Sequence, residues 1–260
     1  MSQMTGYPSI DKPWIKFYSK EAINDPLPEC TIYEYLWENN KNHLDETAII
    51  YYNKKITYGE LFHHINCIAS AFKDVGVKEN DVVTLMVLSQ PETIYCLYAL
   101  NKIGAISCMI NVLSSPKEIV HYMKECDSKY LVVLDALFEK AHAAFKLYPM
   151  AKMIYLPMYQ SLGMVRNFIY RIKVKKPVDT ICNILSWRQF SEKAKELSTI
   201  ANRNIHSCAV IGHTGGTTGT PKGVMLSDFA VNALASQYSN KLDFQRKDTF
   251  LSMIVLLYLG

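Results

Sequence analysis

Ten consecutive residues, Thr214 to Gly223, combine backbone and side chains that suit a polyphosphate; they read Thr-Gly-Gly-Thr-Thr-Gly-Thr-Pro-Lys-Gly. The glycines let peptide N–H groups approach a ligand without meeting a Cβ, the threonines add hydroxyl donors, and Lys222 adds a compact positive charge. Because the stretch offers many donors and no acid, it predicts a phosphate-binding loop. The residues expected to contact phosphate are Thr214, Gly215, Gly216, Thr217, Thr218, Gly219, Thr220 and Lys222.

Two other glycine-rich loops do not fit this spacing. A Walker A loop requires Gly-Lys-Ser/Thr, whereas Pro221 precedes Lys222 and Gly223 follows it. The dinucleotide-binding fingerprint requires Gly-x-Gly-x-x-Gly, and this segment contains no Gly-x-Gly. The remaining alternative is a flexible surface turn, which the order of threonine, glycine, proline and lysine disfavours.

The elements on either side must hold this loop. An apolar run, Cys208–Ile211, leads into it and Val224–Leu226 leads out, so we expect the loop to join strand to strand. Ser227 suits the N-cap of a following helix, with Asp228 in the first turn.

Strand and helix signals alternate along most of the preceding chain. Helices are expected to begin at Thr31, Thr57, Pro91, Ser115 and Ser186, the last reaching about Leu197. The expected strands are Val82–Leu88, Ala105–Ile110, Tyr130–Leu134 and Met153–Leu156, with a hairpin around Asn53–Lys55. Residues 1–30 are expected to be irregular. The alternation predicts an α/β fold with mainly parallel sheets layered with helices on both faces.

The loop resembles the phosphate-loop signature of the adenylate-forming (AMP-binding) superfamily, which includes acyl-CoA synthetases, firefly luciferase and nonribosomal peptide adenylation domains. Gly76–Val83 resembles the turn into the family's first buried strand, and Gly104-Ala105 followed by Asn111 resembles the segment after the next helix. The similarity extends from about Thr31 to Leu256. It also places His213 near the nucleotide, with a purely structural position as the alternative.

The resemblance implies a two-step reaction with ATP, Mg²⁺ and coenzyme A. A small-molecule carboxylate forms an acyl-adenylate, and the CoA thiol then displaces AMP. An acyl-CoA ligase acting on a fatty acid is the favoured member of the family. The alternatives are an adenylation domain for an amino or aryl acid and a non-catalytic nucleotide-binding fragment.

Residues 1–260 are expected to form an incomplete N-terminal AMP-binding domain. The family's aromatic-Gly-x-Thr-Glu motif, its ribose-binding Asp and its mobile C-terminal domain with a catalytic Lys have no counterpart here. Near the end, Val255 stands where the family has proline, and Tyr258 lies near the position of its histidine. We therefore expect a truncated chain that is inactive alone, and no residue of this sequence is assigned as catalytic.

Composition excludes several other classes. A formal charge of +4 is too small to indicate nucleic-acid binding. The seven cysteines include no Cys-x-x-Cys, which disfavours a zinc site or a disulfide framework and suits a reducing cytosol. We find no signal-peptide pattern and no apolar stretch of about 18 residues, so a soluble, cytoplasmic protein is expected. Composition does not predict an oligomeric state.

Met164–Lys176 is strongly basic, with Arg166, Arg171 and Lys173 among its residues and no acid. Its apolar residues would share one helical face. We favour a helix packed on the domain with a solvated basic face. The alternative is peripheral contact with an anionic membrane through residues 164–176.

Overall fold

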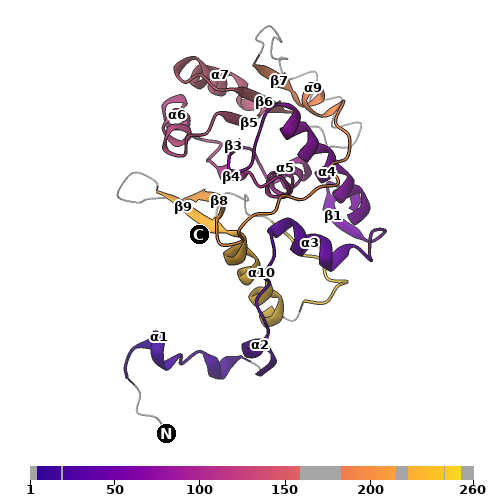
Figure 1. The fold of residues 1–260 in the computed structure, drawn as a ribbon, viewed down its shortest axis with the longest axis vertical. Coiled ribbons are helices and arrows are strands. Elements are labelled where there is room, and N and C mark those ends of the chain that lie inside the picture. Colours follow the sequence, from indigo (N-terminus) through magenta and orange to yellow (C-terminus); the bar gives the residue numbers. More distant parts are fainter. Residues whose placement is uncertain (1–4, 19, 159–182, 215–221, 243, 253–260) are drawn as a thin grey trace.

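The computed structural model describes residues 5–18, 20–158, 183–214, 222–242 and 244–252. Its centre is a seven-stranded sheet with the order β7-β6-β5-β3-β4-β8-β9 (Figure 1). Neighbouring strands from β7 to β8 are parallel, and β9 is antiparallel to β8. The predicted α/β fold with a mainly parallel sheet is confirmed. The strands are β3 (Val82–Met86), β4 (Ile106–Met109), β5 (Tyr130–Leu134), β6 (Lys152–Leu156), β7 (Ile184–Ser186), β8 (Cys208–His213) and β9 (Gly223–Ser227).

Helices cover both faces of the sheet. Leu85 and Val132 face a core that includes residues of α3, α4, α5 and α9. Met86 and Val133, the next residues along the same strands, face a second core with α6 and α7. Because both faces are buried, these strands read as continuous apolar runs. The helices are α3 (Ile32–Asn40), α4 (Tyr58–Asp74), α5 (Pro91–Lys102), α6 (Pro116–Glu125), α7 (Phe138–Leu147), α9 (Trp187–Ser191) and α10 (Asp228–Leu242), with a short η2 (Asp135–Leu137) before α7.

Local sequence sets most helix starts. Thr31, Thr57, Ser115 and Ser186 each accept a hydrogen bond from the N–H three residues later, and the Glu or Gln there bonds back to the N-cap N–H. These complete capping boxes satisfy N–H groups that would otherwise lack partners, each contributing ~1 kcal/mol. The predicted helix starts at these positions are confirmed.

Two glycines end the helices that flank β3. Gly76 follows α4 with φ +99° and Gly104 follows α5 with φ +75°, a left-handed conformation that favours glycine. A Cβ on Gly104 would lie 2.7 Å from the Cγ of Glu79. The turn into β3 therefore packs closely against the turn into β4.

Two expectations need correction, and one strand was not predicted. The helix after Ser186 ends at Ser191 and not near Leu197, because the following backbone bonds to other elements: Leu197 N–H donates to Asn66 O (3.1 Å). β7 was not predicted, since three residues carry little periodic signal. The hairpin of β1 (Thr47–Tyr51) and β2 (Lys54–Thr57) turns at positive-φ Tyr52 and Asn53 instead of at Asn53–Lys55.

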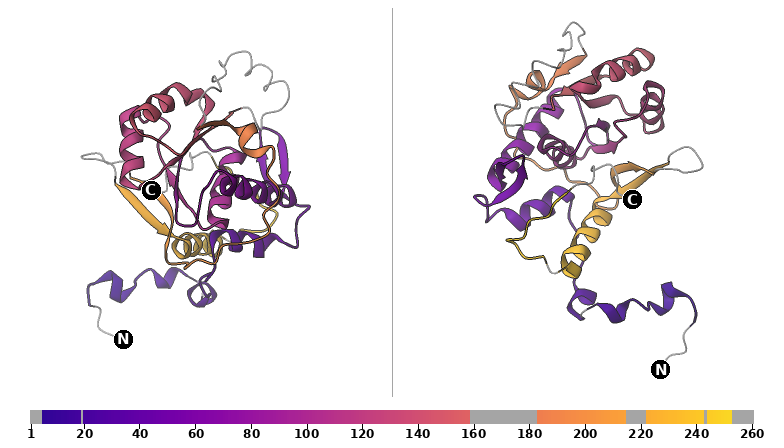
Figure 2. Two further views of the ribbon diagram at one scale, coloured as in Figure 1. Left: turned by 45° about the horizontal axis from the view of Figure 1, so that its top comes forward. Right: turned by 180° about the vertical axis from the view of Figure 1, so that it is seen from behind.

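The first described residues lie apart from the sheet. They form three short helices, α1 (Pro8–Asp11), η1 (Ile15–Phe17) and α2 (Lys20–Asn24). Both views in Figure 2 show this segment extending away from the α/β body toward the N-terminus. The expectation of irregular structure before residue 30 is thus only partly correct.

Candidate phosphate-binding site

β8 and β9 form the stem of the predicted loop. The antiparallel register runs from Cys208 opposite Ser227 to His213 opposite Gly223, with an irregularity between Cys208 and Val210. The expected strand–loop–strand arrangement is confirmed. The helix that follows also begins as expected, because α10 starts at Asp228 and the Ser227 hydroxyl oxygen accepts from Ala230 N–H (3.1 Å).

Thr214 and Lys222 close the base of the loop. Thr214 N–H donates to Lys222 O (3.1 Å), and Lys222 N–H lies 3.4 Å from Thr214 Oγ1. Both residues are exposed, so the Lys222 side chain lies in solvent at the mouth of the stem. The other predicted contact residues, Gly215, Gly216, Thr217, Thr218, Gly219 and Thr220, lie outside the described residues. Phosphate contact by any of these residues stays a prediction.

The stem leads to the carboxyl edge of the sheet. β8 runs parallel to β4, with Met109 opposite Gly212, and β4 runs parallel to β3. β3 has β4 on one side and β5 on the other, so the strand order reverses beside β3. Ligands of open α/β sheets bind outside the carboxyl ends of the strands near such a reversal. The loop base therefore lies at the edge where a nucleotide site is expected.

His213 fastens the end of β8 to its neighbours. Its Nδ1 donates to Met109 O (3.0 Å), because a carbonyl oxygen can only accept. The ring packs against Tyr122 of α6 with a centroid separation of 4.4 Å, and Nε2 lies 4.0 Å from Glu125 Oε2. His213 thus has structural contacts at the end of β8, which do not decide between the two expectations for it. Its nearness to a nucleotide stays a prediction.

Arg203 joins the outer end of the stem to the sheet. Its Nη2 donates to Cys208 O, at the first residue of β8, and its Nη1 donates to Ala105 O (3.4 Å), at the residue just before β4. Its Nε lies 3.1 Å from Asp228 Oδ2, with side chains only 2% and 0% exposed. The contact is an ion pair without hydrogen-bond alignment, since neither atom has a hydrogen-bond partner.

The second carboxylate oxygen of Asp228 holds two other elements. It accepts from Ile32 N–H at 3.0 Å and from Asn101 Nδ2 at 2.5 Å. Asp228 follows β9 directly and Arg203 precedes β8, so the pair brackets both outer ends of the stem. The sequence indicated only a helix-dipole role for Asp228 and gave no signal for its pairing with Arg203, because the partners of Asp228 are separated from it by 25 residues or more.

Other site types find no support in the described ranges. No three His, Cys, Asp or Glu side chains gather closely enough there to hold a metal ion. No helix among these residues is both long and apolar enough to cross a bilayer. The basic stretch 164–176 and the apolar run after Met253 fall outside the described residues.

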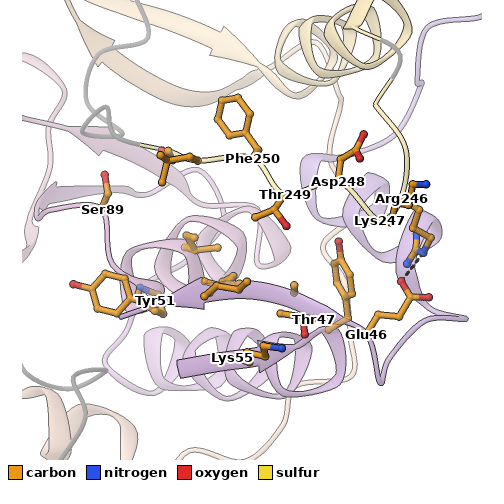
Figure 3. Close-up of a pocket in the computed structure, with 18 of the residues that line it drawn as sticks. Glu46, Thr47, Tyr51, Lys55, Ser89, Arg246, Lys247, Asp248, Thr249 and Phe250 are labelled. Atoms are coloured by element: carbon orange, nitrogen blue, oxygen red, sulfur yellow. Dashed lines mark hydrogen bonds and ion pairs between the residues drawn. The ribbon is translucent and has the colours of Figure 1, made fainter. Parts of the chain in front are cut away.

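A cleft elsewhere in the described structure is lined neither by Thr214 nor by Lys222. It has a volume of about 860 Å³ and lies between the β1–β2 hairpin and residues 246–252 (Figure 3). On one side Arg246 pairs with Glu46 at 2.7 Å and lies over the Tyr58 ring. The prediction of a phosphate site at the stem therefore rests on residue chemistry and sheet topology, and not on the size of a cavity.

Comparison with known proteins identifies the relatives of this chain. It is 29% identical over 223 residues to a long-chain-fatty-acid–CoA ligase of Bacillus subtilis (strain 168), an alignment covering 83% of this chain and 40% of the relative. The fold matches a long-chain-fatty-acid-CoA ligase from Archaeoglobus fulgidus with TM-score 0.70 and 21% identity, over 86% of this chain and 42% of that one. An anthranilate CoA ligase matches with TM-score 0.66 and 20% identity, over 80% and 36%. The chain spans less than half the length of these relatives.

The family model for AMP-binding enzymes matches residues 36–257, a range that includes the seven-stranded sheet, the stem and the loop. The resemblance inferred from the loop is therefore confirmed. This chain belongs to the AMP-binding enzyme family.

Proposed function

We propose that this chain supplies the phosphate-binding part of an AMP-forming acid–thiol ligase. In the first step a carboxylate oxygen attacks the α-phosphorus of ATP, giving acyl-adenylate and pyrophosphate. In the second, the sulfur of coenzyme A attacks the acyl carbon, giving a thioester and AMP. The observation that carries the proposal is the exposed Thr214–Lys222 loop base at the carboxyl edge of the sheet, within a chain of the AMP-binding family.

The residues of the loop have distinct expected roles. The N–H and hydroxyl groups of residues 214–220 would hold the β- and γ-phosphates, and Lys222 would neutralise charge as pyrophosphate leaves. Mg²⁺ fits this arrangement, because it is bound largely through phosphate oxygens and needs no dedicated protein cage. The Arg203–Asp228 pair would act from outside, by fixing the stem from which the loop extends.

A fatty acid is the carboxylate that we propose. The long-chain-fatty-acid–CoA ligases among the relatives favour it. The anthranilate CoA ligase keeps an aryl acid as the second candidate. The open reading frame that contains this sequence should be expressed to its natural end and assayed for acid-dependent exchange of pyrophosphate into ATP. Palmitate, acetate, anthranilate and an amino acid form the panel; a preference for the last two would overturn the fatty-acid proposal.

The 260-residue chain itself allows a direct test of the loop. We expect weak, Mg²⁺-dependent binding of ATP or pyrophosphate and no measurable acyl-adenylate, because positioning of all reacting groups can supply ~7–11 kcal/mol of a barrier. Lys222→Ala should abolish this binding, since one charge-assisted contact contributes ~1.5–3 kcal/mol. Lys146→Ala, at the exposed far end of α7, is the matched control. Calorimetry that finds equal binding in the wild type and Lys222→Ala would remove Lys222 from the site.

The cellular location is part of the same proposal: a cytoplasmic enzyme, with peripheral membrane contact through residues 164–176 as the finer alternative. That contact would depend on charge, so co-sedimentation with phosphatidylserine vesicles should weaken as salt rises. Arg171→Glu with Lys173→Glu should abolish it. Binding that is absent, or unaffected by these substitutions, would support a solvated basic face.

A further inference from the structure

Two cysteines beside the stem are used neither by the loop nor by the proposed ligase chemistry. Cys108 lies in β4, and Cys126 is the C-cap of α6. Their Sγ atoms are 3.7 Å apart, and both are free thiols. Because the two sulfurs of a disulfide are ~2.05 Å apart, an approach of roughly 1.7 Å would allow a bond.

The two thiols differ in their access to solvent. Cys126 is partly exposed and lines a surface cavity of about 330 Å³, together with Gly76, Asn80 and Lys129. Cys108 has no exposed surface and lies behind Cys126 in the core between β4 and α6. A small oxidant in solution can therefore reach Cys126 first, and Cys108 only through it.

The backbone around the two thiols differs as well. Cys108 is held in the sheet on both sides, opposite Thr84 of β3 and Ile211 of β8. Cys126 stands where α6 ends, just before Asp127 with φ +48°. A helix end moves more easily than a central strand, so Cys126 is the residue that would move to bring the two sulfurs together.

The surroundings make Cys126 the more reactive partner. The Cys126 thiol donates to Tyr122 O (2.9 Å) and lies against the Cys108 thiol. The pKa of Cys126 is lowered, chiefly by its hydrogen bond with the Cys108 thiol, while partial burial opposes this effect. The pKa of Cys108 is raised by the same contact and by burial. The cavity adds no net charge, since Lys78 and Lys129 are matched by Asp81 and Asp127.

We propose that Cys126 and Cys108 form a peroxide-oxidised dithiol site. In the first step the Cys126 sulfur attacks hydrogen peroxide, the O–O bond breaks, and sulfenic acid and water form. In the second step the Cys108 sulfur attacks the Cys126 sulfur, the S–O bond breaks, and a disulfide and a second water form. The two thiols lose two electrons in total and peroxide gains them. The disulfide would tie the end of α6 to β4, next to Tyr122 and the His213 that it contacts.

Peptide mass spectrometry of the 260-residue chain tests the proposal. After brief treatment with hydrogen peroxide and alkylation of the remaining thiols, we expect a cross-linked peptide pair containing Cys108 and Cys126, two hydrogens lighter than the reduced pair. Cys108→Ser should replace the cross-link with a dimedone-reactive sulfenic acid at Cys126. Cys126→Ser should leave Cys108 reduced, and Cys108→Ala guards against a folding defect of the first variant.

Two other partly exposed cysteines provide internal controls. Cys67 and Cys30 are also half-buried, but burial raises the pKa of each thiol, so Cys126 should oxidise at least about tenfold faster. Oxidation of Cys126 no faster than that of Cys67 would overturn the proposal. So would its progression to sulfinic acid without the cross-link, or a disulfide to any other cysteine.

Discussion

Two buried polar clusters involve neighbouring residues of α5. In one cluster the positive charge is paired with a carboxylate, and in the other it is bonded to neutral oxygens. Asn101 reaches the cluster of Arg203 and Asp228, where a buried guanidinium lies 3.1 Å from a buried carboxylate. Lys102 reaches the other cluster, where its ammonium donates to two neutral oxygens, Tyr33 OH (3.0 Å) and Asn66 Oδ1. It also lies over the Tyr33 ring, 4.4 Å from its centroid.

In the first cluster the Asp228 carboxylate neutralises the charge of Arg203, whereas in the second no carboxylate among the described residues bonds to the Lys102 ammonium. The acid whose charge acts on the pKa of Lys102 is Glu196. Its side chain is 53% exposed and accepts from Asn66 Nδ2 at 3.2 Å instead of from the ammonium. Burial therefore lowers the pKa of Lys102 to about 8, with Glu196 opposing weakly. The compensated pair brackets the stem of the candidate site, where one fixed geometry is required. The uncompensated lysine instead bonds to Tyr33 and Asn66, neither of which belongs to the stem.

Asp228→Ala should give the largest effect. It leaves the Arg203 guanidinium buried without its carboxylate and removes the acceptor of Ile32 N–H and Asn101 Nδ2. Breaking a buried ion pair in this way costs ~3–5 kcal/mol, so the free energy of unfolding should fall by that amount in denaturant titrations. Binding of Mg·ATP should weaken as well, because the outer end of the stem loses its attachment.

A double variant separates the charge from the shape. Arg203→Met with Asp228→Leu removes both charges and keeps apolar volume, and replacing a buried pair in this way is often nearly neutral. The double variant should therefore be more stable than Asp228→Ala alone. If the two are equally unstable, the hydrogen bonds from Ile32 and Asn101 matter more than the ion pair, and the contrast between the two clusters would be wrong.

Features set by residues close together in the sequence could be predicted, and contacts between residues far apart in the sequence could not. Capping boxes at Thr57 and Ser115 are complete within four residues, so those helix starts were predictable. The stem was predictable because two short apolar runs flank a glycine-rich turn. Asp228 bonds to groups 127 and 196 residues away, and no periodicity or spacing records such a contact. The phosphate contacts themselves were predicted only from residue types and family resemblance.

Lys102→Met should have a smaller effect that depends on pH. At pH 7 the loss is limited, because Tyr33 OH and Asn66 Oδ1 still lie 3.2 Å apart and bond each other. The folded pKa of about 8 is below the ordinary lysine pKa of 10.5, so the unfolded chain binds more protons between these two pH values. The unfolding free energy of the wild type should therefore rise relative to Lys102→Met as pH increases from about 8 toward 10.

Denaturant titrations of both proteins at pH 7, 8, 9 and 9.5 measure this difference. Comparing the variant with the wild type at each pH removes contributions from groups that both share. A difference in unfolding free energy that stays constant across the series would mean that the folded chain keeps Lys102 protonated. The second cluster would then stay charged over this pH range, as the first does.

Ser227→Ala should have the smallest effect, and it tests whether the α10 junction is held by its cap or by Asp228. The Ser227 hydroxyl oxygen accepts one hydrogen bond, from Ala230 N–H at 3.1 Å, and it is less buried than the neighbouring carboxylate. Loss of an N-cap serine costs ~1 kcal/mol, because one helix N–H then has only water as its hydrogen-bond partner.

Thr57→Ala, which removes the N-cap of α4 far from the stem, is the matched control and should cost about the same. Nucleotide binding should be unchanged in both, since Arg203 and Asp228 still bracket the stem. If Ser227→Ala instead weakened Mg·ATP binding as strongly as Asp228→Ala, the loop would depend on the start of α10 as a whole and the buried ion pair would have no special part in positioning it.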